Sequence, residues 1–143
     1  MEANEELNKE ILNILDKYAE CYLNKNLDGL MSLFVSDPDL VAIGTGADEW
    51  VKGPNQLKAG FKRDFSQADN IRLFFENLTI SAAGKVSWVS GATTMQAMIH
   101  GEEIIVPGRV SLVLVENEKV WLIKHLHYSV PSENQEEGAS WPE

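Results

Sequence analysis

The hydrophobic pattern of this chain changes its period once, and this change constrains the fold more than any other feature. From residue 71 onward, apolar and polar side chains alternate, as Ile71, Leu73 and Phe75 do. Successive side chains of a strand point to opposite faces, so the alternation predicts strands. Short polar or glycine-containing turns divide the region into long antiparallel strands. The predicted strand segments are 71–80, 86–99, 104–115 and 120–129.

Two irregularities are expected within these strands. The apolar parity slips between Phe75 and Leu78, which predicts a β-bulge near Glu76 and Asn77. Pro107-Gly108 interrupts the third long segment and indicates a bend, a bulge or an edge position, because proline cannot donate a ladder hydrogen bond.

The first half of the chain follows a helical period instead. Apolar residues recur every three or four positions between Asn4 and Asn24, which predicts an amphipathic helix. Asn26 is a candidate cap for a second, short helix, and Gly53-Pro54 opens a third. Short strands are expected at 40–43 and 50–51. Helices that precede a strand meander indicate an α+β fold.

Charge and length narrow the class of protein. The chain has 143 residues, which suits one domain, and a formal net charge of −10, which argues against binding nucleic acid or an anionic membrane surface. We expect one domain over residues 1–131 and an acidic, disordered tail over 132–143. Cys21 is the single cysteine, and no apolar run is long enough to span a membrane, so a cytoplasmic location is predicted.

Three segments of the chain resemble known sequences. Residues 22–30 and the stretch from Gly44 through Trp50 to Gly53 resemble SnoaL-like domains of the nuclear transport factor 2-like superfamily. The closing segment 121–129 resembles the pattern W-x-[IV]-x-H-x-H-x-S, and is also similar to the association domain of calcium/calmodulin-dependent kinase II.

The resemblance covers most of the chain and implies specific properties. It implies a cone-shaped fold, in which a curved, mostly antiparallel sheet wraps around a helix and a pocket opens at the wide end. It also implies a homodimer formed through the outer faces of the sheets. The superfamily includes isomerases, cyclases, dehydratases and association modules, so the fold alone does not imply one activity.

His125 and His127 are the sharpest candidates for catalysis. Residues two apart on a strand share a face, so the pattern predicts that both imidazoles lie on the same side as Trp121 and Ile123. If that side is concave, both face the pocket, where imidazole can act as an acid or a base near neutral pH. The alternative is a pair of histidines bonded to neighbouring strands or a partner. The other side, with Leu126 and Tyr128, would suit a dimer contact.

Arg109 is a candidate ligand-binding residue. It lies within an apolar strand and would need an acidic partner or a bound anion if it were buried. One hypothesis is a carboxylate anchor inside the cone, which the resemblance to the kinase association domain favours. The alternatives are an ion pair with a nearby acid and outward exposure at the bend.

Asp48 and Glu49 follow a Gly-Thr-Gly turn and form a second candidate pair. Two carboxylates can divide acid and base roles where their surroundings differ, and Asp48 is our candidate catalytic acid or base. Glu49 is a candidate ligand contact, although adjacent strand residues point to opposite sides. A solvated turn is the alternative for either residue. A metal site would need a third ligand, so we expect no metal and no cofactor.

Aromatic side chains complete the predicted site. Tyr18 and Tyr22 lie one helical turn apart on the apolar face of the first helix, and either hydroxyl could polarise a carbonyl or serve as the polar tip of a core residue. Trp50 and Phe61 are expected in the pocket wall or the core.

Three functions follow from these residues. The first is a homodimer that binds a small organic molecule, for which a carboxylate is one option, in a mostly apolar pocket. The second is an isomerase, cyclase or dehydratase that uses histidine or acid chemistry. The third is an association module without a ligand.

Overall fold

The structure is a computed structural model that describes residues 1–143, with three helices and six strands. The helices are α1 (Glu5–Leu23), α2 (Leu27–Met31) and α3 (Gly53–Gln67). The strands are β1 (Val41–Ile43), β2 (Trp50–Lys52), β3 (Asp69–Ala83), β4 (Val86–Ile99), β5 (Glu102–Asn117) and β6 (Val120–Ser129). These elements follow the predicted order.

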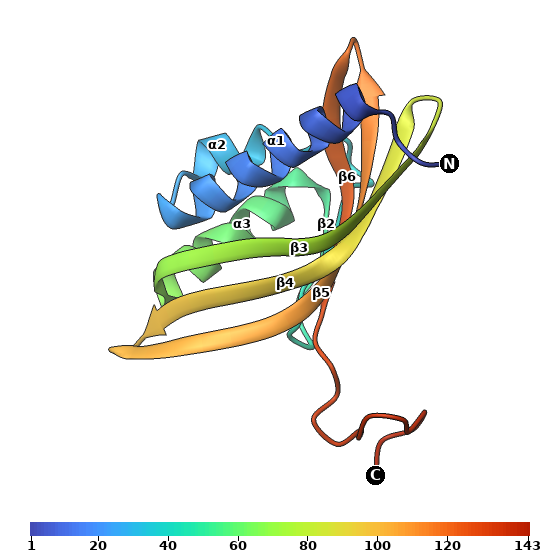
Figure 1. The fold of residues 1–143 in the computed structure, drawn as a ribbon. Helices are drawn as coiled ribbons and strands as arrows, with labels where there is room; N and C mark the ends of the chain where they lie inside the picture. The colour runs from blue at the N-terminus through green and yellow to red at the C-terminus, as the bar shows by residue number, and fades with distance from the viewer.

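All six strands form one sheet, in the order β2-β1-β6-β5-β4-β3. Every neighbouring pair is antiparallel except β1 and β6, which run parallel. The sheet curves strongly, and the three helices lie on its concave side (Figure 1). The predicted α+β fold with a curved sheet is therefore confirmed.

Local signals explain where the first two helices begin. The side chain of Asn4 accepts a hydrogen bond from the backbone N–H of Leu7 at 2.9 Å, and that of Asn26 accepts one from Gly29 at 2.9 Å. Both are N-caps, which satisfy backbone donors that the first helical turn leaves free. The apolar stripe of α1 faces the sheet, and its buried residues are Ile11, Leu15, Tyr18, Cys21 and Tyr22.

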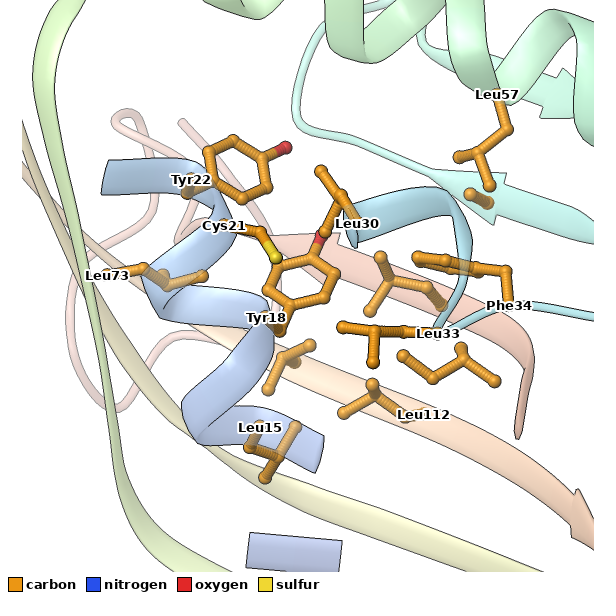
Figure 2. Packing of buried hydrophobic residues seen from close by; sticks show 14 of the residues in the cluster. Leu15, Tyr18, Cys21, Tyr22, Leu30, Leu33, Phe34, Leu57, Leu73 and Leu112 are labelled. Atoms are coloured by element: carbon orange, nitrogen blue, oxygen red, sulfur yellow. The ribbon is translucent and has the colours of Figure 1, made fainter. Parts of the chain in front are cut away.

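The core lies between α1 and the concave face of the sheet. Tyr18 stands in the middle of this cluster, with Leu15 and Cys21 from its own helix and Leu112 from β5 among its surroundings (Figure 2). Its ring lies 6.1 Å from that of Phe34 and 6.4 Å from that of Phe61. α1 thus packs against both the sheet and the segments that follow the helix, and this packing holds Tyr18 in the middle of the core.

A glycine joins β2 directly to α3. Gly53 has a φ of +82°, a backbone conformation that favours glycine, and its N–H donates to the carbonyl of Leu40 at 2.7 Å. Pro54 follows at the start of the helix, where its missing N–H costs nothing. The turn places Leu57 and Phe61 against the core.

The two expected strand irregularities are both present. The β3–β4 register shifts between Glu76 and Thr79, and Asn77 has a φ of +53°, so the predicted bulge is confirmed. Pro107 pairs with Thr94 without a register shift. β6 pairs with β5 only as far as Arg109, so Pro107 lies on a free edge, one of the predicted options.

A further bulge, in β6, is not apparent in the sequence. Val113 pairs with His125 but Leu114 pairs with Ile123, so Lys124 is an extra residue. At Lys124, the segment that pairs with β6 on the side away from β5 changes from residues 33–35 to β1. Ile123 exchanges backbone hydrogen bonds with Leu33 and Val35, at 2.8 and 3.0 Å, whereas the next residues pair with β1.

Lys124 occupies the gap between these two neighbours. Its ammonium group donates to Asp37 at 2.8 Å and also to Asp39, and both carboxylates flank the Pro38 turn that joins the two pairing segments. The bulge therefore arises from tertiary contacts and not from a local sequence signal.

The chain beyond β6 has no helix or strand. Residues 130–143 are exposed and extend away from the body of the fold (Figure 1). Trp141 has an exposed fraction of 81%. None of the three helices is both long and apolar enough to cross a membrane.

Candidate functional site

Two neighbouring cavities open on the concave side of the sheet. One has a volume of about 390 Å³ and lies between α1, α3, the β1–β2 hairpin and the end of β6. The other, of about 260 Å³, lies over the inward faces of β4 and β5. The residues that line both cavities are Tyr22, Gly44, Glu49, Asp64 and Tyr128. These shared residues form the boundary between the two cavities.

Asp64 is the acid at this boundary. It follows Phe61 by one turn of α3, so it lies on the same helix face as Leu57 and Phe61, and its carboxylate accepts a hydrogen bond from the Tyr22 hydroxyl at 3.0 Å. Burial raises the pKa of the Asp64 carboxyl above its ordinary value, while the hydrogen bond from Tyr22 opposes that rise. A carboxyl in this setting can hold or accept a proton.

Two further tyrosine hydroxyls lie nearby. The Tyr18 and Tyr128 hydroxyl oxygens are both buried and make no hydrogen bond of good geometry, although they lie close enough for each to influence the pKa of the other. Burial raises the pKa of both tyrosines well above its ordinary value, so both hydroxyls stay protonated at neutral pH. The hydroxyls of Tyr18, Tyr22 and Tyr128 therefore form a polar group within the otherwise apolar core.

The rim of the first cavity is charged but internally paired. Arg63 donates to the Asp48 carboxylate at 2.8 Å, and its second amino nitrogen lies 3.9 Å from Glu49. The hydrogen bond from Arg63 lowers the pKa of Asp48. Glu49 turns back over the Gly44–Gly46 turn, where it accepts a hydrogen bond from the N–H of Gly46 at 3.0 Å.

Aromatic rings form the inner wall of the first cavity. The rings of Tyr18 and Tyr22 are 5.3 Å apart, and Phe61 meets Tyr22 edge-on at 5.8 Å. Trp50, in contrast, lies at the outer edge with 69% of its surface exposed. The wall is therefore buried at depth and exposed at the rim.

The structure brings together six of the residues singled out in the sequence. These residues line the first cavity: Tyr18, Tyr22, Asp48, Glu49, Trp50 and Phe61. Asp48 and Glu49 both line the first cavity because they belong to the turn at its mouth. Side chains in this turn do not alternate between two faces as they would in a strand. The roles of all six in binding or catalysis stay predictions.

The predicted placement of His125 and His127 is wrong. The bulge at Lys124 reverses the alternation, so Trp121 and Ile123 are buried inward, and the next inward residue is Leu126. Both histidines therefore lie on the outer face, where His127 is exposed, and neither lines the two cavities. The assignment of Leu126 and Tyr128 to an outward dimer contact fails for the same reason, since both line the first cavity.

Arg109 also lies outside the cavities. It pairs with Ala92 and Ser129 on the outer side of β5, and its guanidinium donates to the Ser129 hydroxyl at 3.2 Å. Exposure at the bend, one of the alternatives considered, is what the structure shows. The hypothesis of a carboxylate anchor inside the cone is wrong for this residue, and a carboxylate ligand loses its main support.

Sequence reasoning missed Asp64 and Tyr128. The signal for Asp64 was available: it is the one acid on the apolar stripe of α3, three residues after Phe61. Tyr128 could not be found without the bulge at Lys124. No group of three or more His, Cys, Asp or Glu side chains is arranged to hold a metal ion.

Comparisons with solved structures show the same fold. A nuclear transport factor 2-like superfamily protein from Salmonella enterica serovar Typhimurium matches with a TM-score of 0.84 and 19% identity, over 97% of this chain and 100% of that chain. A candidate dehydratase of the same family from Streptomyces avermitilis gives 0.79 and 12%, over 87% and 96%.

A candidate calcium/calmodulin-dependent kinase II association domain from Xanthomonas campestris gives a TM-score of 0.76 and 19% identity, over 87% of each chain. These identities support a shared fold and not a shared activity.

Sequence comparison gives the family. No curated protein matches the chain. The family description of SnoaL-like domains matches residues 11–133, which include every strand and both cavities. With its nuclear transport factor 2-like fold, the chain belongs to the SnoaL-like domain family.

Proposed function

We propose that this protein binds a small, mostly apolar organic molecule in the two adjoining cavities. The observation that carries the proposal is the pair of adjoining cavities, lined mostly by apolar side chains, with the hydrogen-bonded Asp64 and Tyr22 at the boundary between them. The first cavity, about 390 Å³, falls within the range of small-molecule sites.

Blocking the cavity tests this proposal. Gly60 lines the first cavity, lies in the middle of α3, and has open space where a Cβ would be. Gly60→Leu should fill that space, and it should also favour the helix by roughly 1 kcal/mol. Lys58→Leu is the matched control, since Lys58 is exposed on α3 and does not line the cavity.

The readout is a fragment screen by two-dimensional NMR on the wild type and both variants. We expect fragments to shift the amide signals of cavity residues in the wild type and in Lys58→Leu, and to have no such effect in Gly60→Leu. Fragments that shift the Gly60→Leu spectrum equally would place their site elsewhere and overturn the proposal.

A second candidate function is proton transfer, favoured by one arrangement. Asp64 has a carboxyl whose pKa is raised by burial, close to tyrosine hydroxyls that stay protonated. Such a carboxylate could take a proton from a carbon beside a carbonyl group, while a tyrosine hydroxyl donates to the carbonyl oxygen. In this proposal Asp64 takes the proton-transfer role that the sequence suggested for His125 and His127, because both histidines face away from the cavities.

Deuterium exchange tests the catalytic candidate. An apolar ketone incubated in D₂O should exchange its α-hydrogens faster with the wild type than with Asp64→Asn. Equal rates in the two proteins would overturn the catalytic candidate and leave ligand binding as the proposed function. His127→Ala is the control and should match the wild type.

The assembly we propose is a homodimer joined through the outer face of the sheet. Several large apolar side chains are exposed there: Phe74 at 44%, Trp88 at 40% and Ile105 at 56%. Their strand neighbours Leu73, Val89 and Val106 face inward or line a cavity. Exposed apolar groups on one face favour a protein contact, and the same face would serve a pure association module.

Sedimentation velocity tests the dimer. The double variant Trp88→Glu and Ile105→Glu should sediment as a monomer, because it places charges in the contact. Leu12→Glu, a charge placed at an exposed apolar position of α1, should leave the dimer intact. A monomeric wild type would remove the homodimer from the proposed function.

A further inference from the structure

The charges around the two cavities are unbalanced. The charged residues that line the first cavity are Asp48, Glu49, Arg63 and Asp64. Only Glu49 and Asp64 are charged among the residues that line the second. Three carboxylates therefore face one guanidinium in the first cavity, and two carboxylates face no base in the second.

Arg63, the one basic residue in the lining, is already paired with carboxylates at the rim of the first cavity. Arg63 is hydrogen-bonded to Asp48 at 2.8 Å and lies 3.9 Å from Glu49. Asp64 forms no salt bridge, and its one side-chain hydrogen bond comes from the neutral hydroxyl of Tyr22. Asp64 is thus a half-buried carboxylate that makes no ion pair. Burial is the larger effect on the pKa of Asp64 and raises it, whereas the charge of Arg63 lowers it.

The groups beside Asp64 also suit a donor. The Tyr22 hydroxyl donates its proton to Asp64, which leaves its own lone pairs free to accept a hydrogen bond. Both residues line both cavities. An ammonium group carries three N–H donors, which the Asp64 carboxylate and the Tyr22 hydroxyl oxygen can accept.

The aromatic wall adds a second attraction for positive charge. Tyr18, Tyr22 and Phe61 lie within 6.4 Å of one another, measured between ring centroids. The faces of aromatic rings attract cations, and the attraction grows where water is excluded. Carboxylate, hydroxyl oxygens and rings therefore favour the same sign of ligand charge.

We infer that the ligand is a small apolar amine that binds as a cation, with its ammonium group paired to Asp64 and its hydrocarbon part against the aromatic wall. This inference rests on the proposed function and names its ligand class. An anionic ligand would add a further negative charge beside carboxylates, and the cavities offer no unpaired basic residue to balance it. A neutral ligand would leave Asp64 unpaired.

A series of three probes with one scaffold tests the inference. The probes are 2-phenylethylammonium, 2-phenylethanol and 3-phenylpropionate, which carry a positive charge, no charge and a negative charge. Dissociation constants come from NMR titration of the wild type. We expect the amine to bind at least about tenfold more tightly than the alcohol, and the acid to bind least.

Matched variants separate a specific ion pair from the general attraction of an acidic protein. Asp64→Asn should remove the preference for the amine over the alcohol. Asp16→Asn changes the net charge equally, at an exposed position of α1 outside both cavities, and should keep the preference. The pKa of the Asp64 carboxyl, followed by its ¹³C signal, should also fall when the amine binds, because a cation stabilises the charged form.

The outcomes distinguish this inference from the proposed function. If the alcohol or the acid binds as tightly as the amine and Gly60→Leu blocks that binding, the ligand class is wrong but the proposed function stands. An amine preference that persists in Asp64→Asn likewise overturns the ligand class. If no probe binds the wild type at millimolar concentration, or if Gly60→Leu binds all three unchanged, both are overturned.

Discussion

Tyr18 places a polar group in the middle of the apolar core. Its ring is packed among other aromatic rings, and its buried hydroxyl makes no hydrogen bond of good geometry. Tyr22, one helical turn later, has a comparable burial but donates to Asp64. The two residues therefore allow a matched comparison of an unpaired and a paired hydroxyl in one core.

Removing the two hydroxyls should affect stability differently. Tyr18→Phe removes a buried group that makes no bond, so we expect the free energy of unfolding to stay the same or to rise by up to about 1 kcal/mol. Tyr22→Phe removes a donor to a carboxylate and should lower it by about 1–2 kcal/mol. Urea unfolding of both variants measures this, and a clear loss of stability in Tyr18→Phe would contradict the view that its hydroxyl is unpartnered.

Asp64 should make stability depend on pH with an unusual sign. Because burial raises its folded-state pKa above the unfolded value, the native protein binds this proton more tightly, and stability is lost as pH rises through the folded pKa. We expect Asp64→Asn to be more stable than the wild type at pH 7. The gain should disappear below the ordinary aspartate pKa of about 3.9.

Urea unfolding at a series of pH values, with Asp16→Asn as the exposed control, checks this expectation. A gain for Asp64→Asn that persists unchanged in acid would show that charge is not its cause.

At the scale of the elements, β6 determines which residues reach the cavities. The bulge at Lys124 exists because the strand leaves residues 33–35 and joins β1 at this point. A one-residue shift exchanges the two faces of a strand, so every side chain after Lys124 depends on it.

Because Lys124 is the extra residue, deleting it should keep the inward face of β6 unchanged. Lys124→Ala loses two ion pairs to mostly exposed carboxylates and should cost no more than about 1 kcal/mol. Deletion makes Ile123 and His125 consecutive, as their partners Leu114 and Val113 are, so Leu126 and Tyr128 should stay inward and unfolding should stay cooperative. Circular dichroism and urea titration compare the two variants, and a deletion variant that loses cooperative unfolding would contradict this role of the bulge.

The limits of sequence reasoning follow from the same element. The helices and long strands were predictable because caps, period and turn residues are local, as at Asn4, Asn26 and Gly53. The bulge near Asn77 was also visible, because the apolar parity slips there. The bulge at Lys124 was not visible, because it depends on Asp37 and Asp39, more than 80 residues away.

The candidate site likewise contains residues that the sequence placed correctly and residues that it misplaced. Tyr18, Tyr22 and Phe61 followed from the apolar stripes of α1 and α3, which lie opposite the sheet. His125, His127 and Arg109 were misplaced because the argument assumed regular alternation or a buried face. Tyr128, which actually enters the cavity, was excluded by the same assumption.

For the whole molecule, the folded body and the acidic tail are separable. Residues 130–143 are exposed, and the hydrogen bonds that the backbone of residues 132–143 makes stay within that segment. The tail carries four acids, Glu133, Glu136, Glu137 and Glu143, so its removal changes the formal charge from −10 to −6. The tail does not contribute to the core.

Truncation after Pro131 should leave the melting temperature unchanged to within about one degree, because no buried surface is lost. Trp141 is 81% exposed, so the truncated protein should also lose a red-shifted component of its tryptophan fluorescence. Differential scanning calorimetry and emission spectra test both effects. A large drop in melting temperature would indicate that the tail contacts the body or a second subunit.

The pairing of β6 with both β1 and residues 33–35 has a consequence for synthesis. Residues 33–35 find their strand partner in β6, and β1, which pairs with β2 on one side, finds its second neighbour only in β6. On the ribosome the sheet therefore stays incomplete until residue 129 has left the exit tunnel. Contacts of such long sequence separation slow folding and leave apolar segments uncovered in the meantime. The sheet is thus expected to close late, once β6 is free to pair, and to benefit from a chaperone that shields the first half of the fold.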